Sequence, residues 1–228
     1  MTLFIAGLCF CACDEGKIYP AENNGTSGNK VNMEVVFTGQ DAWPSEYMLV
    51  FAAFGEDEEM PVVSKVISKP DSEKEKVSST LNGLDERSNR VTVSVVNKGR
   101  QALYHFYSCP IDKETEEMTL PVDTIDLAAF ERIQSQVFNN YCITCHGAGD
   151  YAAADLNLTE GKSHTRLVNV EAKLSPDNKK LVLSGKSGQS FLTDILENDL
   201  VQYNHTDVLP EKELITLIKT WIDNGAKE

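Results

Sequence analysis

The heptapeptide YCITCHG, residues 141 to 147, places two thiols three residues apart and an imidazole directly after the second thiol. Three chemistries use this arrangement. Cys142 and Cys145 can close a disulfide, they can donate thiolates to a zinc site, or they can form thioether bonds to a haem whose iron is bound by His146. The other residues of the chain have to distinguish between these three.

The haem interpretation gives all three side chains a role and needs no second motif elsewhere in the chain. Two thiols at this spacing reach two vinyl groups on the porphyrin edge, and the adjacent imidazole then lies under the iron. A disulfide leaves His146 without a function, and zinc needs a further ligand although the sequence has no second CxxC and no HxxxH. A thioredoxin-like pair follows a strand, whereas a helix is expected here. One covalent haem c is therefore predicted, with disulfide and zinc as the alternatives.

The N-terminus predicts export. Residues 1 to 12 contain an uncharged apolar run that is too short to cross a bilayer but suits the apolar part of a signal peptide. Cys13 follows an alanine and precedes two acids, which resembles the lipobox of bacterial lipoproteins, where this cysteine is acylated. A cleavable signal without lipid is the alternative. With the signal removed and Cys13 carrying the lipid, the free thiols are those of Cys109, Cys142 and Cys145, an odd number that forms no complete disulfide framework.

Composition and charge narrow the classes of partner. The chain has 228 residues and a formal net charge of -14, so it repels polyanions and nucleic acid is not expected as a partner. Residues 13 to 30 are rich in Gly, Asn and Ser and are expected to form a flexible tether behind the lipid anchor. The remaining length suffices for two small domains.

Residues 31 to 121 have the pattern of an all-β domain. Short apolar or alternating runs are separated by turn clusters rich in Gly, Pro, Asn and Asp. Val91, Val93 and Val95 share one strand face by their period of two. Six or seven such runs predict an antiparallel β-sandwich of immunoglobulin or fibronectin type III kind. His105 lies on one of the strands and is expected to be a packed residue.

The apolar period changes to a helical one from Thr124 onward. An apolar stripe from Phe130 to Tyr141 predicts a helix that runs directly into the CxxCH motif. A second strong stripe lies at residues 211 to 224, and shorter helices are expected near 163 to 168 and 190 to 197. The predicted fold class is therefore a two-domain β + α chain, in which an all-α domain at residues 122 to 228 follows the sandwich.

The second half also resembles a known family. The segments QVFNNYCITCHGAGDYAAADLNLTEG, SGKSGQSFLTDIL and LPEKELITLIKTWIDNGA are similar to the c-type cytochrome domains in exported proteins of Bacteroidetes and Planctomycetes. The resemblance covers residues 128 to 226, and its closing WI..GA helix is the most specific part after the haem motif. It implies a small all-α cytochrome c domain whose first and last helices cross beside the porphyrin.

The sixth iron ligand is expected to differ from that family. Such domains often place a Met before a Pro ahead of the last helix, but all five Met of this chain lie at or before Met118. His205 stands in the corresponding loop, five residues before Pro210. We therefore expect ligation of the iron by His146 and His205, with His164 as the rival and an open sixth position as the remaining alternative. Imidazole in place of a thioether lowers the redox potential.

The expected function is single-electron transfer at the cell envelope. The chain is predicted to be a lipid-anchored protein of the outer membrane, on its periplasmic or cell-surface face, that exchanges electrons with a redox protein or an oxidoreductase. No enzymatic activity is expected, except peroxidase-like activity if the sixth iron position is open. The alternative is an envelope binding lipoprotein whose β-sandwich is the functional part and whose haem domain is accessory.

Overall fold

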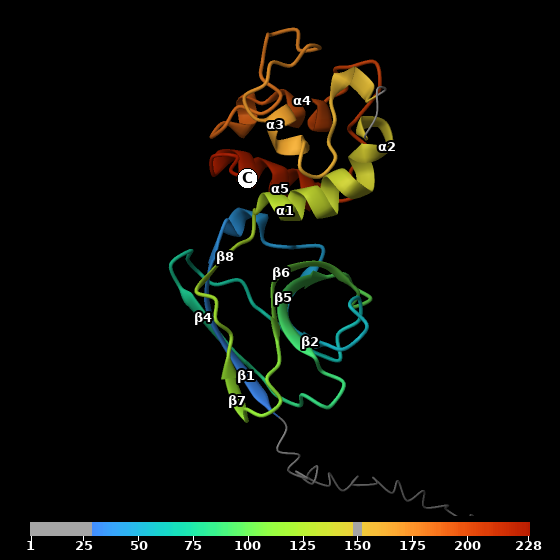
Figure 1. Cartoon of the computed structure of the whole chain (residues 1–228). Coiled ribbons are helices and arrows are strands. Elements are labelled where there is room, and N and C mark those ends of the chain that lie inside the picture. Colours follow the sequence, from blue (N-terminus) through green and yellow to red (C-terminus); the bar gives the residue numbers. More distant parts are fainter. Residues whose placement is uncertain (1–28, 148–151) are drawn as a thin grey trace, which may run out of the picture.

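The computed structural model describes residues 29 to 147 and 152 to 228. Figure 1 shows two stacked halves, with the strands in one half and nearly all of the helical chain in the other. The expected signal peptide, the lipidation site Cys13 and most of the tether lie outside the described residues. None of the helices in the described part of the chain is long and apolar enough to span a bilayer.

The strand half consists of two four-stranded sheets. In the first sheet the central strand β1 pairs antiparallel with β4 and parallel with both β7 and β8. In the second sheet all pairs are antiparallel, in the order β3, β2, β5, β6. The strands are β1 (Lys30–Thr38), β2 (Met48–Phe54), β3 (Val63–Val66), β4 (Lys76–Leu81), β5 (Arg90–Val96), β6 (Ala102–Pro110), β7 (Glu117–Thr119) and β8 (Thr124–Asp126).

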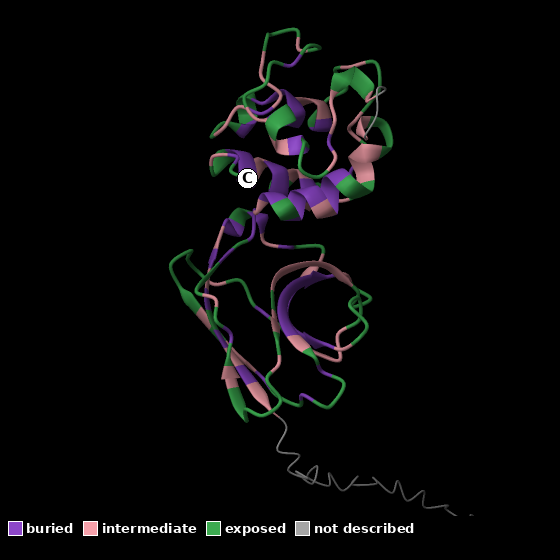
Figure 2. Ribbon diagram, viewed as in Figure 1, coloured by how far each residue is buried: buried purple, intermediate pink, exposed green. Residues whose placement is uncertain are grey.

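Alternation of apolar residues explains how the two sheets pack. Val35 and Phe37 of β1 are 0% exposed, and so are Val91, Val93 and Val95 of β5. Residues two apart on a strand lie on one face, so each sheet turns an apolar face toward the other. Figure 2 shows buried residues on strands of the sandwich half. The shared face predicted for the three valines is therefore the core face of the second sheet.

The second half has short helices joined by irregular chain. Its helical elements are α1 (Phe130–Ile133), the π-helical segment η2 (Gln134–Cys142), α2 (Ile143–His146), α3 (Ser163–Leu167), α4 (Phe191–Glu197) and α5 (Lys212–Asp223). Short 3-10 turns are η1 (Gln40–Ala42) in the strand half, and η3 (Ala153–Asp155) and η4 (Ser187–Gln189) in the helical half. Of the α-helices, only α5, with 12 residues, is longer than two turns.

The predicted fold class is wrong. The chain is mostly β with two sheets and is about 26% helical, and no all-α domain is evident in the described residues. The helical spacing of apolar residues is sustained only before the CxxCH motif and in α5, so residues 168 to 190 form irregular chain tied by isolated β-bridges. Thr124–Asp126, expected to start a helix, is strand β8. The parallel pairs of β1 also depart from a purely antiparallel sandwich.

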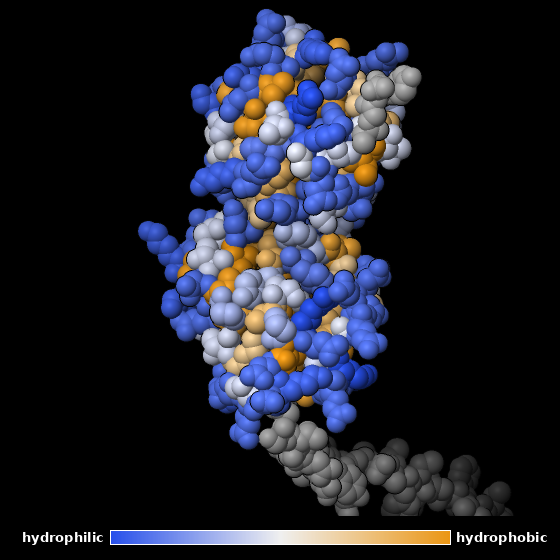
Figure 3. All heavy atoms as spheres, viewed as in Figure 1, coloured by the Kyte–Doolittle hydropathy of each residue, from blue (hydrophilic) through white to orange (hydrophobic). Residues whose placement is uncertain are grey.

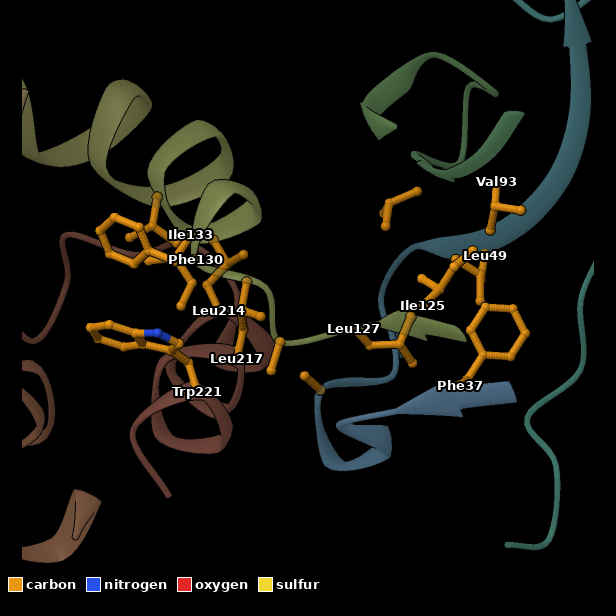
Figure 4. Close-up of a cluster of buried hydrophobic side chains, with 14 of the residues drawn as sticks. Phe37, Leu49, Val93, Ile125, Leu127, Phe130, Ile133, Leu214, Leu217 and Trp221 are labelled. Carbon is orange, nitrogen blue, oxygen red and sulfur yellow. The ribbon is translucent and has the colours of Figure 1, made fainter. Parts of the chain in front are cut away.

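One hydrophobic core runs through both halves. Phe37 and Val93 of the sheets belong to the same buried cluster as Phe130 and Trp221 of the helices. Figure 4 shows Leu127, which is 0% exposed, between these two groups of side chains. The two halves are therefore packed against each other and are not separate domains joined by a flexible linker.

Arg132 reinforces this junction as a buried cation. Its side chain is 1% exposed, and Nη1 donates hydrogen bonds to the carbonyl oxygens of Ala42, at 2.9 Å, and Leu127, at 2.8 Å. Nε donates to Oε1 of Gln136 at 2.7 Å. Burial lowers the pKa of the guanidinium to about 10, so it stays charged at neutral pH. These bonds fix the start of the helical half to the sheets.

Candidate cofactor site

The helix that leads into the CxxCH motif is wound more widely than an α-helix. The nine residues of η2 form a π-helix, and at its end the N–H of Ile143 bonds to the carbonyl of Phe138, five residues back. Nδ2 of Asn140 donates to the carbonyl of Ser135 with the same separation, at 3.0 Å. π-helical winding is rare, and where it occurs, mostly as single-turn bulges within α-helices, it is often at a functional site. A helix before Cys142 was expected from the apolar stripe, but its π winding was not.

The two thiols of the motif lie in different environments. Both are free cysteines in the described structure, so they form no disulfide there. Cys142 is half-buried, and burial, with a smaller contribution from Cys145, raises the pKa of its thiol to about 12. Cys145 lies one turn further on, in α2, and is exposed. One thiol is therefore set into the wall of the site and the other faces outward.

The ring of His146 is oriented by two main-chain carbonyls. Its Nδ1 lies 3.0 Å from the oxygen of Ala153 and 3.2 Å from that of Leu156. Carbonyl oxygens only accept hydrogen bonds, so Nδ1 carries the proton and Nε2 keeps its lone pair. No hydrogen bond reaches Nε2 from the described residues. This is the arrangement found in metal-binding histidines, in which the second ring nitrogen donates to a carbonyl.

The turn that supplies one of these carbonyls is strained. Ala154 and Asp155 follow Ala153 with φ values of 55° and 57°, in the left-handed region that residues with a Cβ rarely adopt. Asp155 also accepts a hydrogen bond from Lys173 at 2.6 Å. Strained backbone of this kind persists where the surrounding structure requires it and clusters at functional sites. The turn holds the carbonyl of Ala153 against the ring of His146.

His205 is oriented in the same way from the loop between α4 and α5. Its Nδ1 lies 2.7 Å from the carbonyl oxygen of Tyr203, whose ring packs edge-on against it with centroids 5.3 Å apart. A turn closes the loop, because Oδ1 of Asn204 accepts from the N–H of Thr206 at 2.9 Å. His205 therefore also holds its proton on Nδ1 and leaves Nε2 available as a ligand.

The structure brings the rings of His146 and His205 together. Their centroids are 6.4 Å apart and their planes are tilted by 32°. A metal–nitrogen bond of about 2 Å plus about 1 Å from the nitrogen to the ring centre, on each side, gives a span of about 6 Å for two imidazoles that share one metal ion. The separation of the ring centres is thus close to that of two imidazoles sharing one iron, and the residue types present, two Cys and two His, are those that hold a haem c.

His164 is not part of this arrangement. Its Nε2 is 2.8 Å from the carbonyl oxygen of Ala226, and its ring packs against Phe130 and Trp221 with centroids 5.1 Å and 6.1 Å away. His105 lies in the sandwich, where its Nδ1 is 2.7 Å from Oγ of Ser94. Both rings use a nitrogen for an internal hydrogen bond, and both are packed residues.

The described residues offer no cluster of three or more His, Cys, Asp or Glu side chains that is placed to hold a metal ion. A structural zinc site needs four protein ligands, so the zinc alternative finds no support in that part of the chain. Haem iron differs, because the porphyrin supplies four nitrogens and the protein only the axial ligands. A pair of imidazoles is sufficient for that purpose.

Comparison with protein-family models, with curated proteins and with solved structures finds no match to this chain. The site therefore has to be interpreted from its own geometry. Sequence reasoning missed the carbonyls of Ala153, Leu156 and Tyr203, because main-chain oxygens are carried by every residue type and leave no signal in a sequence. Likewise, no pattern in the sequence predicts the strained backbone at Ala154 and Asp155.

Proposed function

We propose that this protein carries one covalently attached haem c and transfers single electrons. The observation that carries the proposal is the pair of imidazoles 6.4 Å apart, each with its Nδ1 against a main-chain carbonyl. Cys142 and Cys145 would hold the haem by thioether bonds, and His146 and His205 would bind its iron from opposite sides. A haem bound there supplies a one-electron ferric/ferrous couple.

The protein tunes this couple through the ligands and their partners. Hydrogen bonds from Nδ1 to the carbonyls of Ala153 and Tyr203 fix both rings and raise their basicity, which favours the ferric state. Two imidazoles without a thioether set a lower potential than a Met/His pair. His146 and His205 would both hold the iron of such a haem, which would leave peroxide no site to bind and would favour electron transfer over peroxidase chemistry.

The partner we propose is a second redox protein or an oxidoreductase with a basic docking patch. The net charge of -14 steers cations toward the chain and slows the approach of anionic partners. A lipid on Cys13 would anchor the protein at the periplasmic or cell-surface face of the outer membrane. The anchor would keep the site near such a partner. That part of the proposal rests on the N-terminal sequence.

The experiment that tests this function is a redox titration of protein exported from a strain competent for cytochrome c maturation. We expect one reversible one-electron wave, with haem bands that persist after acid-acetone extraction. The matched control is the double variant Cys142→Ser, Cys145→Ser, which should lose all acid-stable haem. Wild-type protein that matures without covalent haem, or that holds haem without a reversible wave, rules the proposal out.

A further inference from the structure

A groove of about 390 Å³ lies on the sandwich where it meets the start of the helical half. Its lining includes Tyr104, Phe106 and Tyr107 of β6 and Ile125 of β8, which we call its floor, and the exposed acids Asp126 and Glu131, which we call its rim. None of these residues belongs to the cofactor site. Figure 3 shows that apolar side chains reach the surface of the sandwich half just below the waist between the two halves.

The strand that forms this floor is an open sheet edge. β6 is the last strand of its sheet, and in the described part of the chain only β5 pairs with it. It is nine residues long, it carries no Lys, and its one Pro is the terminal Pro110. Sheet edges in monomeric proteins are usually short, charged or interrupted, because unpaired main-chain groups recruit another strand. β6 is neither short nor charged along the groove, although its register against β5 shifts at two places, between Val93 and Ser94 and between Val95 and Val96.

The aromatic floor is held in place before any ligand arrives. The rings of Tyr104 and Phe106 pack edge-on with centroids 5.0 Å apart, and the guanidinium of Arg132 lies 5.5 Å from the Phe106 centroid, over the ring. The hydroxyl of Tyr107 donates to the carbonyl oxygen of Pro121 at 3.4 Å. A floor fixed in this way loses little conformational entropy when a ligand binds.

The charge at the rim points to a basic ligand. Asp126 and Glu131 are exposed, and neither forms an ion pair with a described residue. The cation of the adjoining helix, Arg132, is 1% exposed and is already bonded to the carbonyls of Ala42 and Leu127. A second copy of the chain would bring the same acids to the groove, and a neutral sugar would leave the charge of the acids and the main chain of the sheet edge unpaired.

We propose that this groove binds an extended, basic peptide segment of a partner protein, which adds to the sheet as a strand beside β6. Main-chain hydrogen bonds to the free edge give affinity in this mode, and side chains on alternate positions give specificity. Every second side chain of the segment packs on the aromatic floor, and a Lys or Arg pairs with Asp126 or Glu131. This inference does not depend on the haem.

The test is a selection from a random peptide library on the immobilised holoprotein. We expect enriched peptides that alternate apolar residues with Lys or Arg, and the tightest of them is then synthesised. Its affinity should fall about tenfold in the variant Glu131→Lys, because reversal of an exposed rim charge repels a basic ligand. The matched control is Glu86→Lys, another exposed acid, which should bind the peptide as the wild type does.

Hydrogen exchange on the same complex places the peptide. We expect slower exchange of the amides of β6 that β5 leaves unpaired. Enriched peptides without basic residues, equal binding by Glu131→Lys, or unchanged exchange in β6 each overturn the inference, as does groove binding by a neutral oligosaccharide in place of peptides. The peptide should also bind the Cys142→Ser, Cys145→Ser variant, so failure here and failure of the haem proposal are distinguishable.

Discussion

The two halves of this molecule are stabilised in different ways. The sandwich relies on regular alternation, with Val91, Val93 and Val95 all fully buried against the opposite sheet. The helical half relies more on individual polar contacts to main-chain groups. Asp223 accepts from the N–H and the hydroxyl of Ser187, both at 2.7 Å, and the hydroxyl of Ser184 donates to the carbonyl of Gly225 at 2.6 Å.

The proposed cofactor site lies in the half with less regular structure. His146 and His205 receive their orientation from carbonyls of a strained turn and a loop, and neither ring is held by a partner side chain through a hydrogen bond. Loops positioned by a rigid scaffold commonly carry functional groups. Here the sheets and α5 form the scaffold, and a covalent cofactor would add the packing that short helices lack. The following predictions test this contrast.

The largest effect is expected from the comparison of two histidines. Replacement of His205 by Ala removes the proposed sixth ligand, so the ferric spectrum of the holoprotein should change completely from low-spin to high-spin. His164→Ala should leave the protein low-spin, because that ring bonds Ala226 instead. Absorption and electron paramagnetic resonance spectra report both states. A low-spin His205→Ala protein contradicts the assignment of the ligand.

The two thiols of the haem-free protein should differ about a hundredfold in alkylation rate. Cys142 has a pKa of about 12, so its thiolate is scarce at pH 8, whereas Cys145 is exposed. The rate at Cys142 should rise as the pH approaches 12, because only the thiolate reacts. Iodoacetamide labelling followed by fragment mass spectrometry measures each site. Equal alkylation rates of the two thiols at pH 8 would mean that the Cys142 thiol is not buried.

Replacement of Arg132 by Ala should lower the free energy of unfolding by about 3 kcal/mol, because it leaves buried carbonyls without donors and a cavity beneath α1. The carbonyls concerned belong to Ala42 and Leu127. Urea unfolding followed by circular dichroism measures the loss. Arg166→Ala, at an exposed position, serves as the control and should cost little. An unchanged midpoint of urea unfolding for Arg132→Ala would show that the packing of the two halves does not depend on this residue.

The smallest effect is expected inside the sandwich. Oγ of Ser94 lies 2.6 Å from Oγ1 of Thr92 and 2.7 Å from Nδ1 of His105, in a short buried chain of hydrogen bonds. Ser94→Ala should cost about 1 kcal/mol of unfolding free energy, the usual net value of such bonds. Thermal unfolding of the variant checks this value. A loss as large as that of Arg132→Ala would mean that the sandwich also depends on individual polar contacts.

The sequence predicts the features that depend on local pattern. The face shared by Val91, Val93 and Val95 follows from their spacing, and His205 was selected because no Met follows the motif. The parallel pairing of β7 and β8 with β1 depends on long-range packing, so Thr124–Asp126 was mistaken for the start of a helix. Irregular chain between Val168 and Ser190 has no periodic signal. The all-α prediction failed for that reason.

The most direct test of the central claim is the intact mass of the mature, exported protein. We predict the mass of the polypeptide and its lipid plus one haem, and fragmentation should place that haem on the peptide that contains Cys142 and Cys145. A colourless protein with the mass of the polypeptide and its lipid alone would contradict the account.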